Sequence, residues 1–352
     1  MNEIQIKRQI QIMRGIAILM VVMHHTINNL PDNLGGGYLL ILFNSDVTIF
    51  MVISGYLFEK NIIRYKADKK RFVIRKAKQL MIPYIFWSFI LYIGAKVVHD
   101  LIGGGLSSFL LQLGFTRLTW WQIAYNIVTF QNSYDEHIWF IYVLFLYFVV
   151  AVICPDKFQS KWTVILLLLM TALSGYYLTV PTLLWKFIKH LGDFMLGCVL
   201  YKEIETWKSE DYDLKKVVMC AAVVFSISYI AMAVVIPLLE ENVWTAILRT
   251  HVNRTMMYSV VVINWFWAGF IAVSGTGCSR VINLIGDYSY DIYLMHMPYV
   301  VPVAARAIYR ISSSWLISFI FSVVLGIIVP LILSETVIRK SKPLRLVMLG
   351  AG

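Results

Sequence analysis

Long apolar runs dominate this sequence, and they restrict the chain to very few folds. We identify ten of them, each of about 17–25 residues, the length that an α-helix needs to cross the hydrocarbon core of a bilayer. The runs are 12–30, 38–58, 79–98, 138–154, 162–180, 184–201, 217–237, 256–274, 287–303 and 315–335. Lipid offers backbone polar groups no partner, so such runs must be helical. The sequence therefore predicts an all-α, polytopic integral membrane protein with about ten transmembrane helices.

The composition agrees with this fold and argues against a separate soluble domain. Hydrophobic residues make up 59% of the chain and charged residues only 14%. No stretch between the runs exceeds about forty residues, which is too short for an independent core. We therefore treat 1–352 as a single transmembrane domain.

The distribution of Lys and Arg predicts the orientation of the chain. Positively charged loops stay in the cytoplasm, and about 23 of the 31 basic residues fall on one side of the predicted membrane. These segments, with Arg14 at their edge, are 1–11, 59–78, 155–161, 202–216, 275–286 and 336–352. Both termini are then cytoplasmic in this multi-pass protein. The asymmetry accounts for the net charge of +11, so no nucleic-acid partner is expected.

The segment from Lys60 to Lys78 is unusually basic, with nine basic residues set against Glu59 and Asp68. One interpretation is an anchor on anionic membrane lipids. The other is a binding surface for a polyanionic cytosolic ligand. Composition alone favours neither. The four cysteines, by contrast, show no metal-ligand spacing and none lies in an outer loop, so we expect neither a metal site nor a disulfide.

Arg14 and His25 lie eleven positions apart in the first apolar run. Eleven helical steps return a side chain to within roughly 20° of its starting direction, about 16 Å further along the axis. Ionisable groups inside a membrane are costly and are therefore functional candidates. The simpler interpretation is that Arg14 reaches back to the membrane surface and that His25 hydrogen-bonds another helix. The neighbouring His24 points about 100° away and is expected to do the latter.

Five blocks of this sequence, in order along nearly the whole chain, resemble the membrane acyltransferase 3 family of bacterial O-acetyltransferases. The blocks are Arg14–His25, Val47–Leu57, Leu80–Trp87, His137–Tyr142 and Ile285–His296, with Glu335 matching a late acidic position. In one respect the chain departs from the family. Where the family commonly has two arginines spaced three apart ahead of the third block, this chain has Lys76 and Gln79. A lysine offers a point charge rather than a bidentate fork.

The resemblance implies transfer of an acyl group, usually acetyl, from cytosolic acetyl-CoA to a hydroxyl of a surface polysaccharide or lipid-linked sugar. It also implies a location in a bacterial cytoplasmic membrane. Acetyl-CoA would be the donor and not a permanently bound cofactor. Its phosphates would be recognised by basic side chains at the cytoplasmic edge. The candidates are Arg14, Arg71, Arg75, Lys76 and Lys78. The pantetheine arm would then extend along the first helix toward His25.

His25 is the candidate catalytic residue, assisted by Arg14. A histidine has a pKa suited to removing the proton of a sugar hydroxyl as the new bond forms. A covalent acetyl-imidazole on His25 is the alternative route. Asp46, inside the second apolar run, would either orient His25 or pair with a basic side chain.

Candidates for acceptor binding lie in two later blocks. His137 and Trp139 are expected in the outer half of the membrane, where Trp139 would stack on a sugar or join an aromatic belt. Ser289, Tyr293 and His296 share one helix face. They would line the acyl or acceptor cavity, or form a polar seam between helices. Ser54–Gly55 is expected to allow close approach of two helices.

A transporter or exporter of a glycan or small polar solute is the alternative function. Many spans and intramembrane polar residues are typical of that class. Against it, the two halves of the sequence show no repeat. A sensor or assembly scaffold is a third possibility, and it would tolerate replacement of His25.

Overall fold

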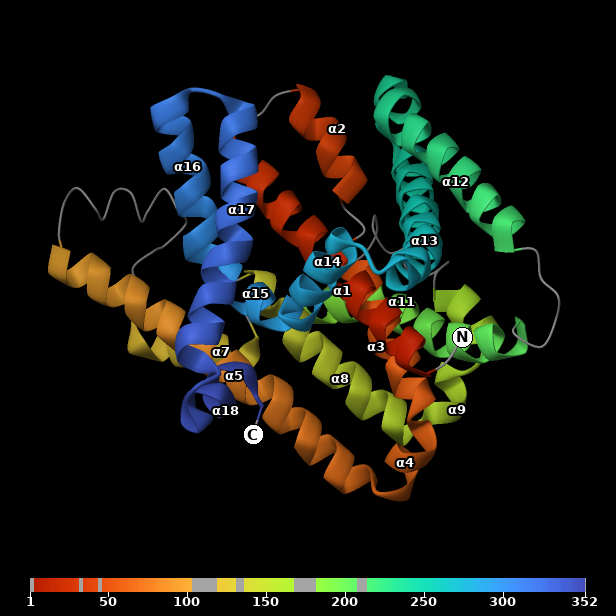
Figure 1. Ribbon diagram of the computed structural model, residues 1–352, viewed down its shortest axis with the longest axis horizontal. Helices are drawn as coiled ribbons and strands as arrows, with labels where there is room; N and C mark the ends of the chain where they lie inside the picture. The colour runs from red at the N-terminus through yellow and green to blue at the C-terminus, as the bar shows by residue number, and fades with distance from the viewer. Residues whose placement is uncertain are drawn as a thin grey trace.

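The computed structural model describes residues 3–31, 34–43, 46–102, 119–130, 136–167, 182–207 and 214–351. Within these ranges every regular element is a helix, and no strand is present. The all-α prediction is confirmed. In Figure 1, α1 runs through the middle of the molecule, with α12 and α13 on one side of it and the α16–α17 pair on the other.

The elements have the following bounds. The first half contains α1 (Glu3–Asn28), α2 (Leu34–Phe43), α3 (Asp46–Lys60), α4 (Ile62–Ala67), α5 (Lys69–Ile102), α7 (Trp120–Thr129), η1 (Glu136–Ile138), α8 (Trp139–Ile153) and α9 (Pro155–Phe158). The second half contains α11 (Thr182–Trp207), α12 (Leu214–Ile230), η2 (Ala231–Val235), η3 (Ile236–Leu238), α13 (Val243–Ser274), α14 (Gly277–Asp287), α15 (Ser289–Met295), η4 (His296–Val300), α16 (Val301–Ser312), α17 (Trp315–Leu333), η5 (Ser334–Ile338) and α18 (Lys342–Leu349).

Several of these helices are long and apolar enough to cross a membrane. In the described part of the chain there are five: Glu3–Asn28, Gly36–Lys60, Lys215–Leu238, Val243–Ser274 and Trp315–Ile338. The helix α8 is apolar but shorter. The predicted run 287–303 is divided among α15, η4 and α16, and most of 162–180 lies outside the described residues. The chain is thus a multi-pass helical membrane protein, while the number ten and the cytoplasmic termini stay predictions.

Glycines bring two pairs of helices into backbone contact. A Cβ added to Gly55 of α3 would overlap the backbone carbonyl of Phe194 in α11. A Cβ on Gly286 of α14 would likewise overlap the carbonyl of Gln11 in α1. Close approach of this kind is how membrane helices commonly associate. The predicted packing role of Gly55 is confirmed, and both contacts hold the helices that surround the site.

The helix that begins at α15 breaks at His296. Met297 has extended backbone angles (φ −114°, ψ 158°), and regular helix resumes only at α16. Pro298 follows the break, and a proline has no amide to continue the helical hydrogen bonding. A break inside a membrane protein leaves backbone carbonyls that need other donors. The side chain of His296 supplies one of these donors.

Candidate active site

The helix α1 places Arg14 and His25 as the sequence predicted. It is continuous from Glu3 to Asn28, so the two residues lie on one stripe about 16 Å apart. Arg14 lines two cavities near the first turns of the helix. His25 sits in the last turn, where its ring meets side chains from other helices.

Two histidines from distant parts of the chain, His137 and His296, meet His25. Its ring centroid lies 5.2 Å from that of His296 and 6.5 Å from that of His137. The His137 and His296 centroids are 5.4 Å apart, and His24 approaches His25 edge-on at 5.6 Å. His137 and His296 are buried, whereas His25 is partly exposed. The His25 ring therefore points into the helix bundle, and we call His25, His137 and His296 the histidine cluster.

Tyr293 connects the two buried members of the cluster. Its hydroxyl donates a hydrogen bond to the backbone carbonyl of His137, which ties α15 to η1. The Tyr293 ring lies 5.8 Å from the His137 ring and 6.2 Å from the His296 ring. A residue predicted to line the cavity thus also fixes the geometry of the histidine cluster.

The hydrogen bonds of His296 define its protonation pattern. Its Nδ1 lies 3.0 Å from the carbonyl oxygen of Ile292 and 2.9 Å from that of Tyr293. Carbonyl oxygens only accept, so Nδ1 must carry a proton. In the neutral ring Nε2 then holds a lone pair, and this atom is buried without a hydrogen-bond partner in the described part of the chain.

One cavity is lined by Arg14 and by a residue that contacts the histidine cluster. Its volume is about 200 Å³, and its walls are mostly apolar. The lining residues are Arg14, Phe50, Ile53, Ser54, Leu80, Phe140, Leu144, Ser289, Tyr290 and Tyr293. Among them, Tyr293 packs against His137 and His296. Of the three residues predicted on this helix face, Ser289 and Tyr293 therefore line the cavity, whereas His296 does not.

A second cavity of about 400 Å³ opens on the N-terminal side of Arg14. It is lined by Glu3, Ile4, Lys7, Ile10, Gln11, Arg14, Leu57 and Lys60. Arg14 lines both cavities. Its Nη1 donates to Gln11 Oε1 at 3.2 Å, and Gln11 Nε2 donates to Asp287 at 2.6 Å. This chain of hydrogen bonds holds the guanidinium where it borders both cavities.

The basic residues of α5 divide into two groups. Arg71, Arg75 and Lys78 are exposed, as expected of a surface that meets lipid or solvent. Lys76 is partly buried, with Nζ 4.3 Å from the centroid of the Phe148 ring. Burial, together with the charges of Arg75 and Arg14, lowers the pKa of Lys76 to about 8. Of the four predicted donor-binding cations in 71–78, Lys76 is the one placed near Arg14.

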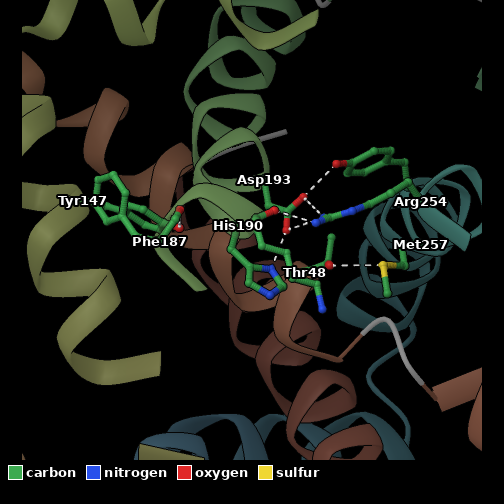
Figure 2. A network of polar contacts seen from close by, with 9 residues as sticks. Thr48, Tyr147, Phe187, His190, Asp193, Arg254 and Met257 are labelled. Carbon is green, nitrogen blue, oxygen red and sulfur yellow. Dashed lines mark hydrogen bonds and ion pairs between the residues drawn. The ribbon is translucent and has the colours of Figure 1, made fainter. Parts of the chain in front are cut away.

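A second polar cluster, which the sequence interpretation missed, joins α11 to α13 (Figure 2). Asp193 accepts hydrogen bonds from Arg254 Nη1 at 2.8 and 3.0 Å, from the Tyr258 hydroxyl at 2.7 Å and from His190 Nδ1 at 2.8 Å. Arg254 also donates to the carbonyl of Lys189. The available signal was the presence of His190 and Asp193 inside an apolar run, since intramembrane charge demands a partner.

The network formed by Asp193, His190, Arg254 and Tyr258, which we call the Asp193 network, contacts Trp139. The sequence predicted that Trp139 binds the acceptor sugar. The His190 ring packs on the Trp139 indole with centroids 5.0 Å apart and an interplanar angle of 31°. Lys186 Nζ lies 5.6 Å from the same indole. The two predicted acceptor-binding residues therefore lie in different surroundings. His137 belongs to the histidine cluster, whereas Trp139 packs against His190 of α11. Asp46 begins α3, but its side chain lies outside the described residues.

The main ionisable groups of the candidate active site are imidazole and guanidinium groups. Across the described ranges, no group of three or more His, Cys, Asp or Glu residues is arranged to hold a metal ion. The cysteines Cys154, Cys198, Cys220 and Cys278 are unpaired.

Together, these features define a multi-pass helical membrane protein in which one cavity is lined by Arg14 and by Tyr293, and Tyr293 packs against the histidine cluster. A family model described as an acyltransferase domain matches residues 7–335, and the chain belongs to this acyltransferase 3 family. The sequence resemblance is thereby confirmed. Comparisons with curated proteins and with solved structures gave no match.

Proposed function

We propose that this membrane acyltransferase transfers an acyl group, in the first instance acetyl, from cytosolic acyl-CoA to a sugar hydroxyl. The acceptor would be a surface or exported polysaccharide, or its lipid-linked precursor. The observation that carries the proposal is the cavity lined by both Arg14 and Tyr293, since Tyr293 packs against His137 and His296, the two rings that meet His25. A bulky anionic donor can be held at one end of such a cavity while its reactive end reaches the other.

The two cavities suit the two parts of coenzyme A. The wider one carries Lys7, Lys60 and Arg14, and cations of this kind bind phosphate groups. The narrower, apolar one would take the thin pantetheine arm and bring the thioester toward Tyr293. The distance of about 16 Å along α1 is comparable with the length of that arm. Arg14, which lines both cavities, would contact the pyrophosphate of the donor, and Lys76 would add positive charge nearby.

His25 would act as the general base. The imidazole lone pair takes the proton of the acceptor hydroxyl while the oxygen attacks the carbonyl carbon of the thioester. A carbon–oxygen bond forms, the carbon–sulfur bond breaks, and the CoA thiolate leaves with the proton returned from His25. His25 is only partly buried as a residue, which is compatible with access of the acceptor.

Labelled acetyl-CoA offers a direct test. Membranes of the source cell that contain the protein should transfer radiolabel into extractable glycan, and the His25→Ala variant should not. The variant should still insert into the membrane and show a CoA-dependent thermal shift, because its donor site is intact. Absence of transfer by the unaltered protein would disprove the proposal. Label that remains on the protein without an acceptor would indicate the acetyl-imidazole route.

Transport is the second candidate, and the helix break at η4 is the observation that favours it. Discontinuous helices near the middle of the membrane form substrate sites in many transporters. A flux measurement in vesicles free of acetyl-CoA separates the two functions. Substrate movement without covalent change would favour transport.

A further inference from the structure

The Nε2 atom of His296 is a buried polar atom with no hydrogen-bond partner in the described part of the chain. The residue has 0% exposure, so solvent does not satisfy the atom. Buried polar atoms of this kind are rare in native proteins because each one loses its hydration without compensation. Its position beside the candidate base makes it a candidate for a role in the reaction.

The structure leaves little freedom in what this atom can do. Both hydrogen bonds at Nδ1 run to carbonyl oxygens of the same helix, so the ring is fixed in orientation and in tautomer. Nε2 of the neutral ring is therefore an acceptor. It can receive a proton or a hydrogen bond but has none of its own to give.

The distance to His25 suits such a hydrogen bond. Two imidazole rings joined in line by one N–H···N bond of about 2.9 Å have their centroids roughly 5 Å apart. The centroids of His25 and His296 are 5.2 Å apart, with the rings tilted by 52°. Rotation of the partly exposed His25 ring would align the donor without movement of the backbone. Hydrogen bonds in an unliganded catalytic site often tighten only when substrate binds.

We propose that His296 is a positioning residue for His25. Its Nε2 accepts a hydrogen bond from one ring N–H of His25, so that the other His25 nitrogen presents its lone pair to the acceptor hydroxyl. The inference rests on the proposed acyl transfer and adds the group that orients the base. In a Ser–His–Asp triad a carboxylate has this part. Here a neutral imidazole does so and adds no negative charge to the membrane interior.

The arrangement also accounts for the proton during the reaction. His25 takes a proton from the acceptor hydroxyl at one nitrogen and keeps the N–H that His296 accepts at the other. The resulting imidazolium makes a charge-assisted hydrogen bond to His296, which is stronger than the neutral one. The proton from the hydroxyl then passes to the departing CoA thiolate, and both rings return to their starting tautomers.

Two substitutions of His296 distinguish a role in positioning His25 from a role in stabilising the end of α15. In His296→Asn the side-chain amide can still donate to the carbonyls of Ile292 and Tyr293, but no acceptor reaches His25. In His296→Gln the amide oxygen can occupy the place of Nε2. We expect kcat of the Asn variant to fall on the order of 100-fold, the cost of a misplaced catalytic group, with an unchanged KM for acetyl-CoA. The Gln variant should retain at least ten times more activity than the Asn variant.

The outcomes distinguish this inference from the proposed function. Transfer by the unaltered protein and its loss in His25→Ala establish the function in the same assay. If His296→Asn then matches the unaltered protein, or if the Gln and Asn variants lose activity equally, the positioning role is wrong. Nitrogen-15 NMR of histidine-labelled protein in nanodiscs checks it without a variant. A His296 ring protonated at Nε2 rather than Nδ1 would overturn the inference.

Discussion

The histidine cluster and the Asp193 network both contain buried polar side chains, but hydrogen bonding satisfies only the Asp193 carboxylate completely. Each carboxylate oxygen of Asp193 accepts two hydrogen bonds, Oδ1 from Arg254 and Tyr258 and Oδ2 from Arg254 and His190. That number fills the four lone-pair positions of a carboxylate. In the histidine cluster, the Nε2 lone pair of His296 has no partner in the described residues.

The difference indicates what each cluster does. A satisfied polar network rigidifies the elements that it joins, here α11 and α13 beside Trp139. The unsatisfied lone pair of His296 can accept a hydrogen bond from the neighbouring His25 ring when substrate binds. Intramembrane polarity alone therefore does not identify a catalytic site. The completeness of the hydrogen bonding separates structural from chemical clusters.

The sharpest test of this contrast is the His25→Ala substitution. We expect transfer to fall by at least 10²–10⁴-fold, the usual contribution of a general base, with little change in thermal stability. Steady-state transfer from labelled acetyl-CoA gives the first quantity, and a thermal unfolding assay gives the second. A variant that unfolds early but remains active when folded would assign His25 to structure.

Asp193→Asn should lower the stability of the protein and leave its activity nearly unchanged, the opposite of the result expected for His25→Ala. It leaves the buried Arg254 guanidinium without its counter-charge, and breaking a buried pair costs about 3–5 kcal/mol. The melting temperature should fall markedly, while kcat per folded molecule should stay close to that of the unaltered protein.

Asp156→Asn is the matched control, because Asp156 is 88% exposed in its ion pair with Lys66. That control should change stability by no more than about 1 kcal/mol. A large loss of kcat in Asp193→Asn would extend the catalytic site to α11.

What the sequence predicted correctly was local. Arg14 and His25 belong to one helix, so spacing fixes their relation, and the same holds for Ser289 and Tyr293 at consecutive turns of α15. The sequence also predicted a helical membrane fold, because long apolar runs have few alternatives.

What the sequence did not predict depends on how helices pack. Asp193 and Arg254 are 61 residues apart, on helices whose neighbours cannot be deduced from periodicity. The meeting of His137 and His296 at His25 has the same origin. The division of run 287–303 was missed because Pro298 is a single residue in an otherwise apolar stretch. Such features depend on tertiary contacts and not on local pattern.

Arg14→Gln tests the donor end of the cavity. Hydrogen bonds to charged groups contribute about 1.5–3 kcal/mol, so KM for acetyl-CoA should rise about 10- to 100-fold. Because Arg14 lies about 16 Å from His25 along α1, kcat should change less than KM. Arg8→Gln is the control on the same helix, since Arg8 donates to Ser279 at 3.0 Å and lines neither cavity. An equal effect of the two substitutions would remove Arg14 from the donor site.

The smallest expected effect is a pH dependence of donor binding. Burial beside Arg75 and Arg14 lowers the pKa of Lys76 to about 8, so its positive charge is present below that pH and is lost as the pH rises through it. Acetyl-CoA should therefore bind less tightly above pH 8, by up to about fivefold, since one partly exposed charge pair contributes no more than roughly 1 kcal/mol. The phosphates of the donor do not interfere, because a phosphate monoester has its second pKa near 6 and is almost fully ionised by pH 8. Acetyl-CoA is a better probe than free CoA, whose thiol titrates in the same range.

In Lys76→Arg the charge persists at all these pH values, so affinity should stay constant, whereas Lys78→Arg should leave the dependence unchanged. A dependence that survives in Lys76→Arg would have to come from another group.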